Sequence, residues 1–391
     1  MTMIDGEVAA GFEPVREAFA ANFERHGDIG AAVCVYRDGR PVVDLWGGVA
    51  DPDSDRPWAR GTLQLVYSAT KGATAAAAHL LAQRGALDLE APVAEYWPEF
   101  AANGKAEIPV GWLLSHQAGV VALDRAVPLA GALAWEPMVA ALAAQRPAWT
   151  PGTAHGYHGR TFGWLVGEVI HRISGRSPGR FFADEIAAPL GLDFFIGLPA
   201  SERDRVSRMV YKQPEFDLTA VPLESIPEEF RPLVAALVDP NSLYNRAFSV
   251  TDPAEIDFNA PEVQAAEIPA SNGIGTARAL ARMYAALIGE VDGVRLFTPE
   301  TLTAATKERA NGPDQVMIMP SRFGSGYMLP TDFNPMTGPQ AFGHPGRGGS
   351  LGFADPELGI AFGYVMNHII EDAPNDARAA SLVEAVRKSL A

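Results

Sequence analysis

Residues 63–84 have the sequence Leu63-Gln-Leu-Val-Tyr-Ser-Ala-Thr-Lys-Gly-Ala-Thr-Ala-Ala-Ala-Ala-His-Leu-Leu-Ala-Gln-Arg84. The part from Ser68 onward is rich in alanine, which is the best helix former, and Gly85 follows as a natural helix stop. An apolar stretch, Leu63–Tyr67, comes immediately before it. We therefore predict a long helix over Ser68–Arg84, with Ser68 at its start.

Ser68 and Lys71 form an S-x-x-K motif at the start of this helix. Residues three apart on a helix lie on one face, about 5–6 Å apart at Cβ, so the lysine can reach the serine hydroxyl. A serine hydroxyl is a weak nucleophile until a base takes its proton, and a desolvated lysine with a lowered pKa can be that base. Backbone N–H groups at the helix start can stabilise an oxyanion. The alternative is a helix-capping serine beside a solvated lysine.

A second candidate is Tyr157, in the loop Gly156-Tyr-His-Gly159, which precedes an apolar helix predicted over Phe162–Ile173. The ordinary pKa of a tyrosine is about 10. Beside a lysine cation the phenol could ionise and act as a general base or as a proton shuttle. The alternative is an aromatic residue of the core.

A third candidate is the glycine-rich segment Phe342-Gly-His-Pro-Gly-Arg-Gly-Gly-Ser-Leu-Gly352. Glycine lets the backbone approach a ligand closely, and Pro345, which has no N–H, suits an edge strand. Such an edge could supply a second N–H donor to an oxyanion and a substrate-binding rim. The alternative is a glycine-rich turn between strands with a surface histidine.

The same segment contains a rival nucleophile, Ser350, in the G-x-S-x-G pattern Gly348–Gly352. The nucleophile elbow of an α/β-hydrolase needs a strand, a sharp turn and then a helix, with an acid and a histidine further along the chain. A short strand and a turn follow Ser350, only His368 remains downstream, and no repeated βαβ units precede it. These features disfavour Ser350 as the nucleophile.

No metal or cofactor site is predicted. His155, His158 and His171 have a spacing that fits no common zinc pattern. Asp51–Asp55 resembles a calcium loop only superficially, because the glycine and the final glutamate of such a loop are missing. The sequence also has no phosphate-binding loop and no dinucleotide fingerprint.

Further elements are predicted along the chain, and they place strands at both ends with helices between them. They are a helix over Pro14–Phe23, strands over Ala31–Arg37 and Pro41–Trp46, a helix over Ala277–Ile288, strands over Gln340–His344, Ser350–Ala354 and Gly359–Asn367, and a final helix over Asp376–Leu390. This pattern predicts an α+β fold in which an antiparallel β-sheet flanked by helices accompanies a helical domain.

We predict a sheet domain from residues 1–90 and 275–391 and a helical, loop-rich domain from residues 91–274, with the active site between them. The segment Arg203–Pro269 is acidic, rich in proline and weakly periodic. We expect it to be an irregular insertion near the mouth of a pocket.

Composition excludes several classes of function. The chain has 391 residues and a net charge of -16, which disfavours a nucleic-acid partner. The single cysteine, Cys34, allows no intramolecular disulfide and no cysteine-based metal site, and it is predicted to lie in a buried strand. The N-terminus has no signal-peptide pattern and no stretch reaches the about 18 apolar residues of a membrane span, so we expect a cytoplasmic protein.

Several motifs in this order resemble the class C β-lactamase-like serine hydrolases, and most closely the family VIII carboxylesterases. The resemblance covers nearly the whole chain and implies a β-lactamase/DD-peptidase-like fold. It is carried by Val66–Gly72, by Ala86-Leu-Asp-Leu-Glu-Ala-Pro-Val93, by Trp112-Leu-Leu-Ser-His-Gln-Ala-Gly119, by Trp149-Thr-Pro-Gly152 through Tyr157 to Pro189-Leu-Gly-Leu192, and by Gly343-His-Pro-Gly346. In this family G-x-S-x-G also occurs as a non-catalytic pattern.

The resemblance implies a role for each matching residue. Ser68 would be the acylated nucleophile, Lys71 would ease its deprotonation, and Tyr157 would be the base that relays the proton to the leaving group and activates water. His344 would take the third-motif lysine position, and Gly346 would belong to the same substrate-binding edge. The backbone N–H groups of Ser68 and Arg347 would form the oxyanion hole.

Two departures from the β-lactamase pattern bear on the substrate. Gly159 replaces the asparagine of the Y-x-N motif, and His344, mostly neutral at pH 7, replaces the third-motif lysine that would bind a β-lactam carboxylate. Pro345 also removes the hydroxyl of the third motif. These changes favour uncharged esters over β-lactams.

We therefore expect a carboxylesterase that hydrolyses small short-chain or aryl esters through an acyl-enzyme on Ser68, without a cofactor. A β-lactamase, a D-aminopeptidase or a transacylase on the same scaffold is the nearest alternative. A non-catalytic binding protein is the alternative of another class. The oligomeric state stays open.

Overall fold

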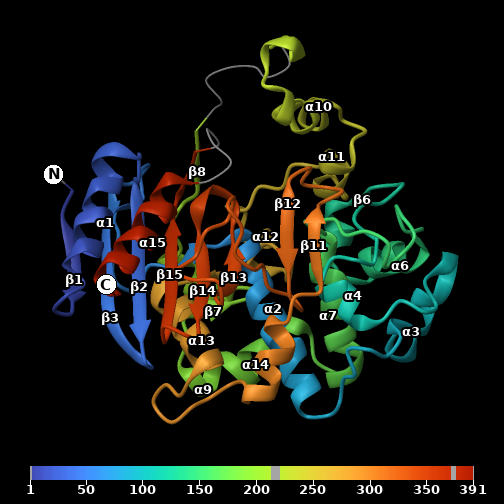
Figure 1. Ribbon diagram of the computed structural model, residues 1–391, viewed down its shortest axis with the longest axis horizontal. Helices are drawn as coiled ribbons and strands as arrows, with labels where there is room; N and C mark the ends of the chain where they lie inside the picture. Colours follow the sequence, from blue (N-terminus) through green and yellow to red (C-terminus); the bar gives the residue numbers. More distant parts are fainter. Residues whose placement is uncertain (1, 213–220, 371–375, 391) are drawn as a thin grey trace.

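An antiparallel sheet built from both ends of the chain forms one side of the molecule (Figure 1). The structure is a computed structural model that describes residues 2–212, 221–370 and 376–390. Its strands lie in the order β1 (Ile4–Val8), β3 (Arg40–Asp51), β2 (Gly30–Arg37), β15 (Ile360–Met366), β14 (Leu351–Asp355) and β13 (Phe342–Pro345), and β4 (Arg56–Pro57) pairs with β3. The pairing of β2 with β15 joins the N-terminal strands to the C-terminal ones.

Helices cover both faces of this sheet. The terminal helices α1 (Glu13–Arg25) and α15 (Ala377–Leu390) pack together on one face. On this side the hydroxyl of Tyr364 in β15 donates to the buried Asp28. Its neighbour Gly363 faces α13 (Ala277–Ile288) instead. Because successive residues of a strand point to opposite faces, α13 covers the other side. A Cβ at Gly352 would lie 2.7 Å from the Tyr284 ring of α13, so glycine allows this close packing.

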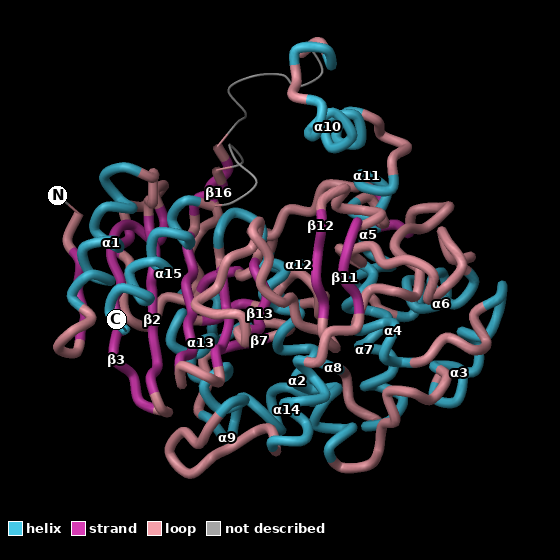
Figure 2. The backbone as a smooth tube through the Cα atoms, in the orientation of Figure 1, coloured by secondary structure: helices cyan, strands magenta, loops and turns pink. Residues whose placement is uncertain are grey.

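The central helix α2 (Thr70–Gln83) joins the sheet to the helical part of the molecule (Figure 2). It is buried along nearly its whole length, and small alanine side chains let α7 (Thr161–Ser174) and strand β13 approach it. The remaining helices are α3 (Val93–Tyr96), α4 (Val110–Leu114), α5 (Leu129–Leu133), α6 (Glu136–Ala144), α8 (Pro178–Phe182), α9 (Ala188–Leu190), α10 (Arg231–Val238), α11 (Leu243–Phe248), α12 (Pro261–Ala265) and α14 (Pro299–Thr306).

Short strand pairs connect distant segments near the start of α2. Strand β10 (Ile274–Gly275) pairs with both β5 (Gln64–Leu65) and β7 (Phe194–Phe195). The other small pairs are β11 (Ala310–Pro313) with β12 (Pro320–Phe323), β16 (His368–Ile369) with β8 (Val210–Tyr211), and β6 (Val127–Pro128) with β9 (Thr251–Asp252). Three-ten turns, Tyr67–Ala69 and Arg347–Gly349, lie just before α2 and just after β13.

The predicted elements are confirmed in type, and several boundaries differ. The helix predicted from Ser68 begins with the three-ten turn and becomes α-helical at Thr70. The strand predicted over Pro41–Trp46 continues to Asp51, because pairing with β1 and β2 carries it through two glycines. Strand β1 was not predicted, since Gly6 interrupts its pattern.

Part of the segment predicted as an irregular insertion projects from the molecule at α10, whereas α12 lies in the body of the molecule (Figure 1). Within Arg203–Pro269 the structure has only short helices and two-residue strands, and residues 213–220 lie outside the described residues. In the described ranges no helix has the length and apolar character needed to cross a bilayer. The division of the chain into a sheet domain and a helical domain stays a prediction.

Candidate active site

Ser68 lies in the three-ten turn that leads into α2, and it is partly exposed between buried neighbours. The preceding residue, Tyr67, has a φ of 46°, in the left-handed region that a bulky residue rarely adopts. Contacts hold Tyr67 there: its hydroxyl lies 2.7 Å from that of Tyr211, and its ring meets the edge of Phe258 at 5.1 Å between centroids. The strained backbone therefore lies directly before the candidate nucleophile.

Lys71 is fully buried beneath Ser68. Its Nζ lies 3.1 Å from Ser68 Oγ, 2.8 Å from the carbonyl oxygen of Gly159 and 3.0 Å from that of Ala270. Burial lowers the pKa of Lys71 well below its ordinary 10.5, and the nearby Arg160 charge lowers it further. A neutral amine at this position can accept the Ser68 proton. The alternative of a capping serine beside a solvated lysine is wrong.

Tyr157 is another buried group that contacts this pair. Its ring centroid lies 4.8 Å from Lys71 Nζ, and its hydroxyl hydrogen-bonds with Ser68. Burial raises the pKa of Tyr157 above its ordinary value, and this effect outweighs the hydrogen bond with Ser68, which lowers it. Burial thus opposes both the phenolate of Tyr157 and the ammonium of Lys71, the reverse of the expected phenolate beside a lysine cation.

Two segments that are distant in sequence fix the Tyr157 loop. The Oδ1 atom of Asp314 accepts the backbone N–H of Tyr157 at 3.0 Å. The carbonyl oxygen of His116 accepts the N–H of Gly156, and its Nδ1 accepts the N–H of His158, both at 3.0 Å. Burial lowers the pKa of His116 well below its ordinary value, which keeps Nδ1 free to accept. Neither Asp314 nor a role for His116 was predicted from the sequence.

The third motif brings His344 to the site on β13. Its ring centroid lies 5.8 Å from that of Tyr157. The side chain is buried, so the alternative of a surface histidine is wrong, and burial lowers its pKa to about 3. Its Nδ1 bonds with the carbonyl oxygen of Pro345, while Nε2 is buried without a hydrogen-bond partner in the described part of the chain. His344 is therefore a neutral group beside Tyr157.

The two residues after this strand have different roles in the structure. The N–H of Gly346 donates to the carbonyl oxygen of Ser350 at 2.6 Å, so it cannot also be an oxyanion donor. A Cβ at Gly346 would collide with the carbonyl oxygen of Val66, so glycine allows β13 to approach the strand that leads to Ser68. Arg347 lies near Tyr67, Tyr211 and Arg160, close enough for its charge to lower their pKa values.

Four side chains thus meet at one place. They are Ser68 and the buried Lys71 at the start of α2, Tyr157 from the loop before α7, and His344 on β13. A family model described as Beta-lactamase matches residues 15–386. The chain belongs to the beta-lactamase family.

Relatives of this beta-lactamase family member include esterases. It is 39% identical over 367 residues to "Esterase/beta-lactamase LipL" of Mycobacterium tuberculosis (strain ATCC 25618 / H37Rv), covering 92% of this chain and 82% of that protein. A solved family VIII carboxylesterase is 36% identical with a TM-score of 0.86, covering 99% and 100% of the two chains. A penicillin-binding protein homologue from Caulobacter crescentus has the same identity and coverage, with a TM-score of 0.84. These likenesses confirm the predicted fold class.

In this beta-lactamase family member Ser350, the alternative candidate for the nucleophile, has a structural role. Its side chain is fully buried, and its hydroxyl donates to the carbonyl oxygen of Val66 at 2.8 Å. Strand β14 follows it, not a helix. Ser350 therefore fastens the third motif to the backbone just before Ser68, and the α/β-hydrolase alternative is wrong.

The histidines weighed as metal ligands are not brought together. His155 bonds with Ser321, His171 with Glu168 and His158 with the carbonyl oxygen of Gly156. Within residues 2–212, 221–370 and 376–390 no group of three or more candidate ligands could hold a metal ion. A surface hollow lined by residues such as Ala122 and Arg246 contains none of the candidate catalytic side chains.

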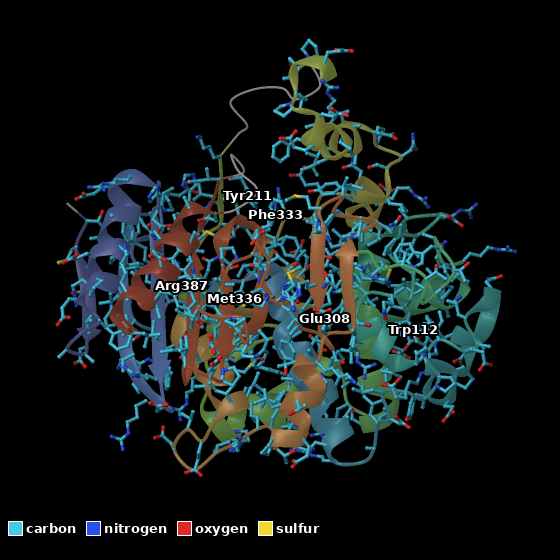
Figure 3. The ribbon with its side chains drawn as sticks, viewed as in Figure 1. Trp112, Tyr211, Glu308, Phe333, Met336 and Arg387 are labelled. Carbon is cyan, nitrogen blue, oxygen red and sulfur yellow. The ribbon has the colours of Figure 1, made fainter. Side chains whose placement is uncertain are left out.

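Aromatic residues of the segment 203–269 form part of the site. Tyr211, which Figure 3 shows near the top of the main body and below the projecting α10, bonds with Tyr67, and Phe258 packs against the same residue. Phe248 of α11 lies beside Gly159, where a Cβ would be 2.5 Å from its ring. Phe248 therefore occupies the space that the asparagine of a Y-x-N motif would need. These contacts agree with the predicted position of this segment near the site.

Proposed function

We propose that this protein is a serine carboxylesterase that hydrolyses small esters, with short acyl chains or aryl leaving groups, through an acyl-enzyme on Ser68. The observation that carries the proposal is the 3.1 Å contact between Ser68 Oγ and the buried Lys71 Nζ. The names of the M. tuberculosis relative and of the solved family VIII carboxylesterase support the ester as the substrate class.

In the proposed mechanism Lys71 takes the proton from Ser68 Oγ as the oxygen attacks the ester carbonyl carbon. The backbone N–H groups of Ser68 and Arg347 would stabilise the negative charge on the carbonyl oxygen. The bond to the alcohol oxygen then breaks, and that oxygen receives the proton from Lys71 through the neutral Tyr157 hydroxyl. Water repeats the sequence on the acyl-enzyme, releasing the acid and restoring Ser68.

Lactam hydrolysis is the second candidate, because the name of the M. tuberculosis relative includes both activities. Two features of this chain disfavour it. Phe248 fills the space next to Gly159, and the neutral His344 gives no cation at the third-motif position. We expect the hydrolysis of β-lactams to be slow compared with that of esters.

The decisive experiment compares p-nitrophenyl butyrate hydrolysis by the wild type, Ser68→Ala and Ser350→Ala. Ser68→Ala is expected to lose about 10³-fold or more in kcat. Ser350→Ala should stay within about tenfold in kcat/KM and have a lower Tm, because the Val66 carbonyl oxygen loses its partner. A Ser68→Ala variant with near-wild-type activity would reject the proposal. Wild type that labels with a fluorophosphonate probe but hydrolyses no ester would point to another acyl substrate.

A further inference from the structure

Arg160 is a charged residue near Lys71 and Tyr157 to which the proposed mechanism gives no contact with the substrate. It follows the Tyr157 loop and immediately precedes α7. The central carbon of its guanidinium lies 5.1 Å from the centroid of the Phe258 ring, and that ring contacts Tyr67. The guanidinium therefore lies on Phe258, which in turn packs against the residue before Ser68.

This guanidinium is left without a counter-charge. Its Nη1 atom is buried and has no hydrogen-bond partner, and no acidic side chain pairs with it among the residues that the structure describes. By contrast, Arg172 near the other end of α7 lies 2.6 Å from Glu168, and Arg176 lies 2.7 Å from Glu185. A buried donor of a charged group costs free energy when it has no partner, so Nη1 of the partly buried Arg160 points to a ligand.

The surroundings of Arg160 are also cationic. Burial lowers the pKa of Arg160 to about 10, the tyrosines around it oppose this change, and the charge of Arg347 adds to it. Arg160 remains a cation at neutral pH. The acidic residues on the adjoining loop, Glu255 and Asp257, are exposed and form no ion pair with it. This local positive charge stands out in a chain whose net charge is -16.

We propose that Arg160 forms a carboxylate-binding subsite beside Ser68 and that the preferred esters of this enzyme carry a carboxylate. The inference rests on the proposed esterase function and narrows its substrate class. A guanidinium presents planar, paired N–H donors that match the two oxygens of a carboxylate. Arg160 would supply a positive charge at a place other than the third motif, where His344 is neutral and from which uncharged esters alone were expected.

The test is a pair of matched ester comparisons on the wild type. On the acyl side, p-nitrophenyl hydrogen adipate is compared with p-nitrophenyl hexanoate. On the leaving-group side, 4-carboxyphenyl butyrate is compared with phenyl butyrate. For one of the two pairs we expect kcat/KM to be at least about tenfold higher for the carboxylate ester, the effect of one charged hydrogen-bonded contact.

The same ratio is then measured in Arg160→Leu and Arg160→Lys. A ratio cancels any loss of activity that both esters share, so it isolates recognition of the carboxylate. Arg160→Leu should lower the ratio about tenfold or more, and Arg160→Lys should retain part of it because the charge remains without the planar donors. Arg180→Leu, at an exposed arginine on the neighbouring α8, is the control and should keep the wild-type ratio.

Each outcome decides the inference. A wild-type ratio near one in both pairs, or a ratio that Arg160→Leu leaves unchanged, overturns it and leaves Arg160 as a packing residue on Phe258. If no ester is hydrolysed, the esterase proposal fails separately. The subsite is then judged by calorimetry on Ser68→Ala, where adipate should bind at least about tenfold more tightly than adipamide. Tighter binding of inorganic phosphate than of adipate would overturn the carboxylate assignment.

Discussion

At the scale of single residues, the proposed reactivity of Ser68 depends on a neutral Lys71. Lys71 has two carbonyl oxygens and a serine hydroxyl as neighbours, and no described carboxylate pairs with it. A nearby carboxylate would stabilise the ammonium form and raise its pKa. In this site burial and the Arg160 charge both lower the pKa of Lys71 and therefore favour the neutral amine.

The pH dependence of ester hydrolysis follows from this arrangement. Because only the neutral Lys71 can accept a proton, kcat/KM should rise with pH through a pKa well below 10.5. In Arg160→Gln a like charge is removed, so the pKa of Lys71 should rise and the acid limb should move to higher pH. The profile is measured with p-nitrophenyl butyrate, and Arg180→Gln is the matched control that should show no shift. A limb that moves to lower pH in Arg160→Gln would contradict this account of Lys71.

At the scale of elements, α11 packs closely against the Tyr157 loop. Phe248 of α11 packs beside Gly159, whose carbonyl oxygen accepts a bond from Lys71. Gly159→Asn alone should therefore lower kcat/KM by about tenfold or more, since an overpacked site displaces that carbonyl. Gly159→Asn combined with Phe248→Ala should recover most of the loss, because the double variant has room for the amide.

A double-mutant cycle measures this coupling. The cycle compares the wild type, Gly159→Asn, Phe248→Ala and the double variant. The interaction free energy between positions 159 and 248 should exceed about 0.5 kcal/mol because the two residues are in contact. Strictly additive effects would show that Phe248 does not limit residue 159. The double variant should also hydrolyse a cephalosporin such as nitrocefin faster than the wild type, since it restores the amide of the Y-x-N motif.

Local patterns in the sequence predicted the parts of the site that lie on one element. Ser68 and Lys71 share one helical turn, so their contact follows from a spacing of three. The G-x-S-x-G pattern at Ser350 could be rejected because no helix pattern follows it. Asp314, Arg160 and Phe248 act through contacts with residues far away in the chain, and no local period or motif marks such contacts.

The state of a titratable group was equally hard to predict from the sequence. Tyr157 was expected to ionise beside a cation, but the ammonium of Lys71 is disfavoured by burial that only the folded chain produces. His344 was expected to be mostly neutral at pH 7. Its burial lowers its pKa to about 3, so it is neutral there. The kind of residue at each position was predictable, whereas its charge depended on the packing of several elements.

At the scale of the whole molecule, one buried cluster connects the two ends of the chain. Arg378 of α15 lies 3.2 Å from Asp28, which precedes β2, and it also donates to the carbonyl oxygens of Gly348 and His368. The Tyr364 hydroxyl donates to Asp28 as well. Arg378 therefore joins α15 to the segment that precedes β2 and to the turn Arg347–Gly349, which follows the third motif.

Replacement of this arginine should weaken the whole fold. In Arg378→Met the buried Asp28 loses its cation, and breaking a buried pair in this way costs about 3–5 kcal/mol of unfolding free energy. Urea unfolding followed by circular dichroism measures the change. Lys388→Met on the same helix is the control, because Lys388 is exposed and its distance to Glu384 is 3.9 Å, so its effect should be within about 0.5 kcal/mol.

The pH dependence of this loss has a definite sign. Burial raises the pKa of Asp28 from 3.8 to about 6, although Arg378 and Tyr364 oppose the change. A group whose pKa is raised in the folded state binds its proton more tightly there, so its contribution to stability is full below pH 3.8 and is lost as the pH rises through 6. Without Arg378 the pKa of Asp28 should rise further, and the variant should lose more stability at pH 8 than at pH 5. An equal loss at both pH values would mean that Asp28 is already neutral beside Arg378 in the wild type.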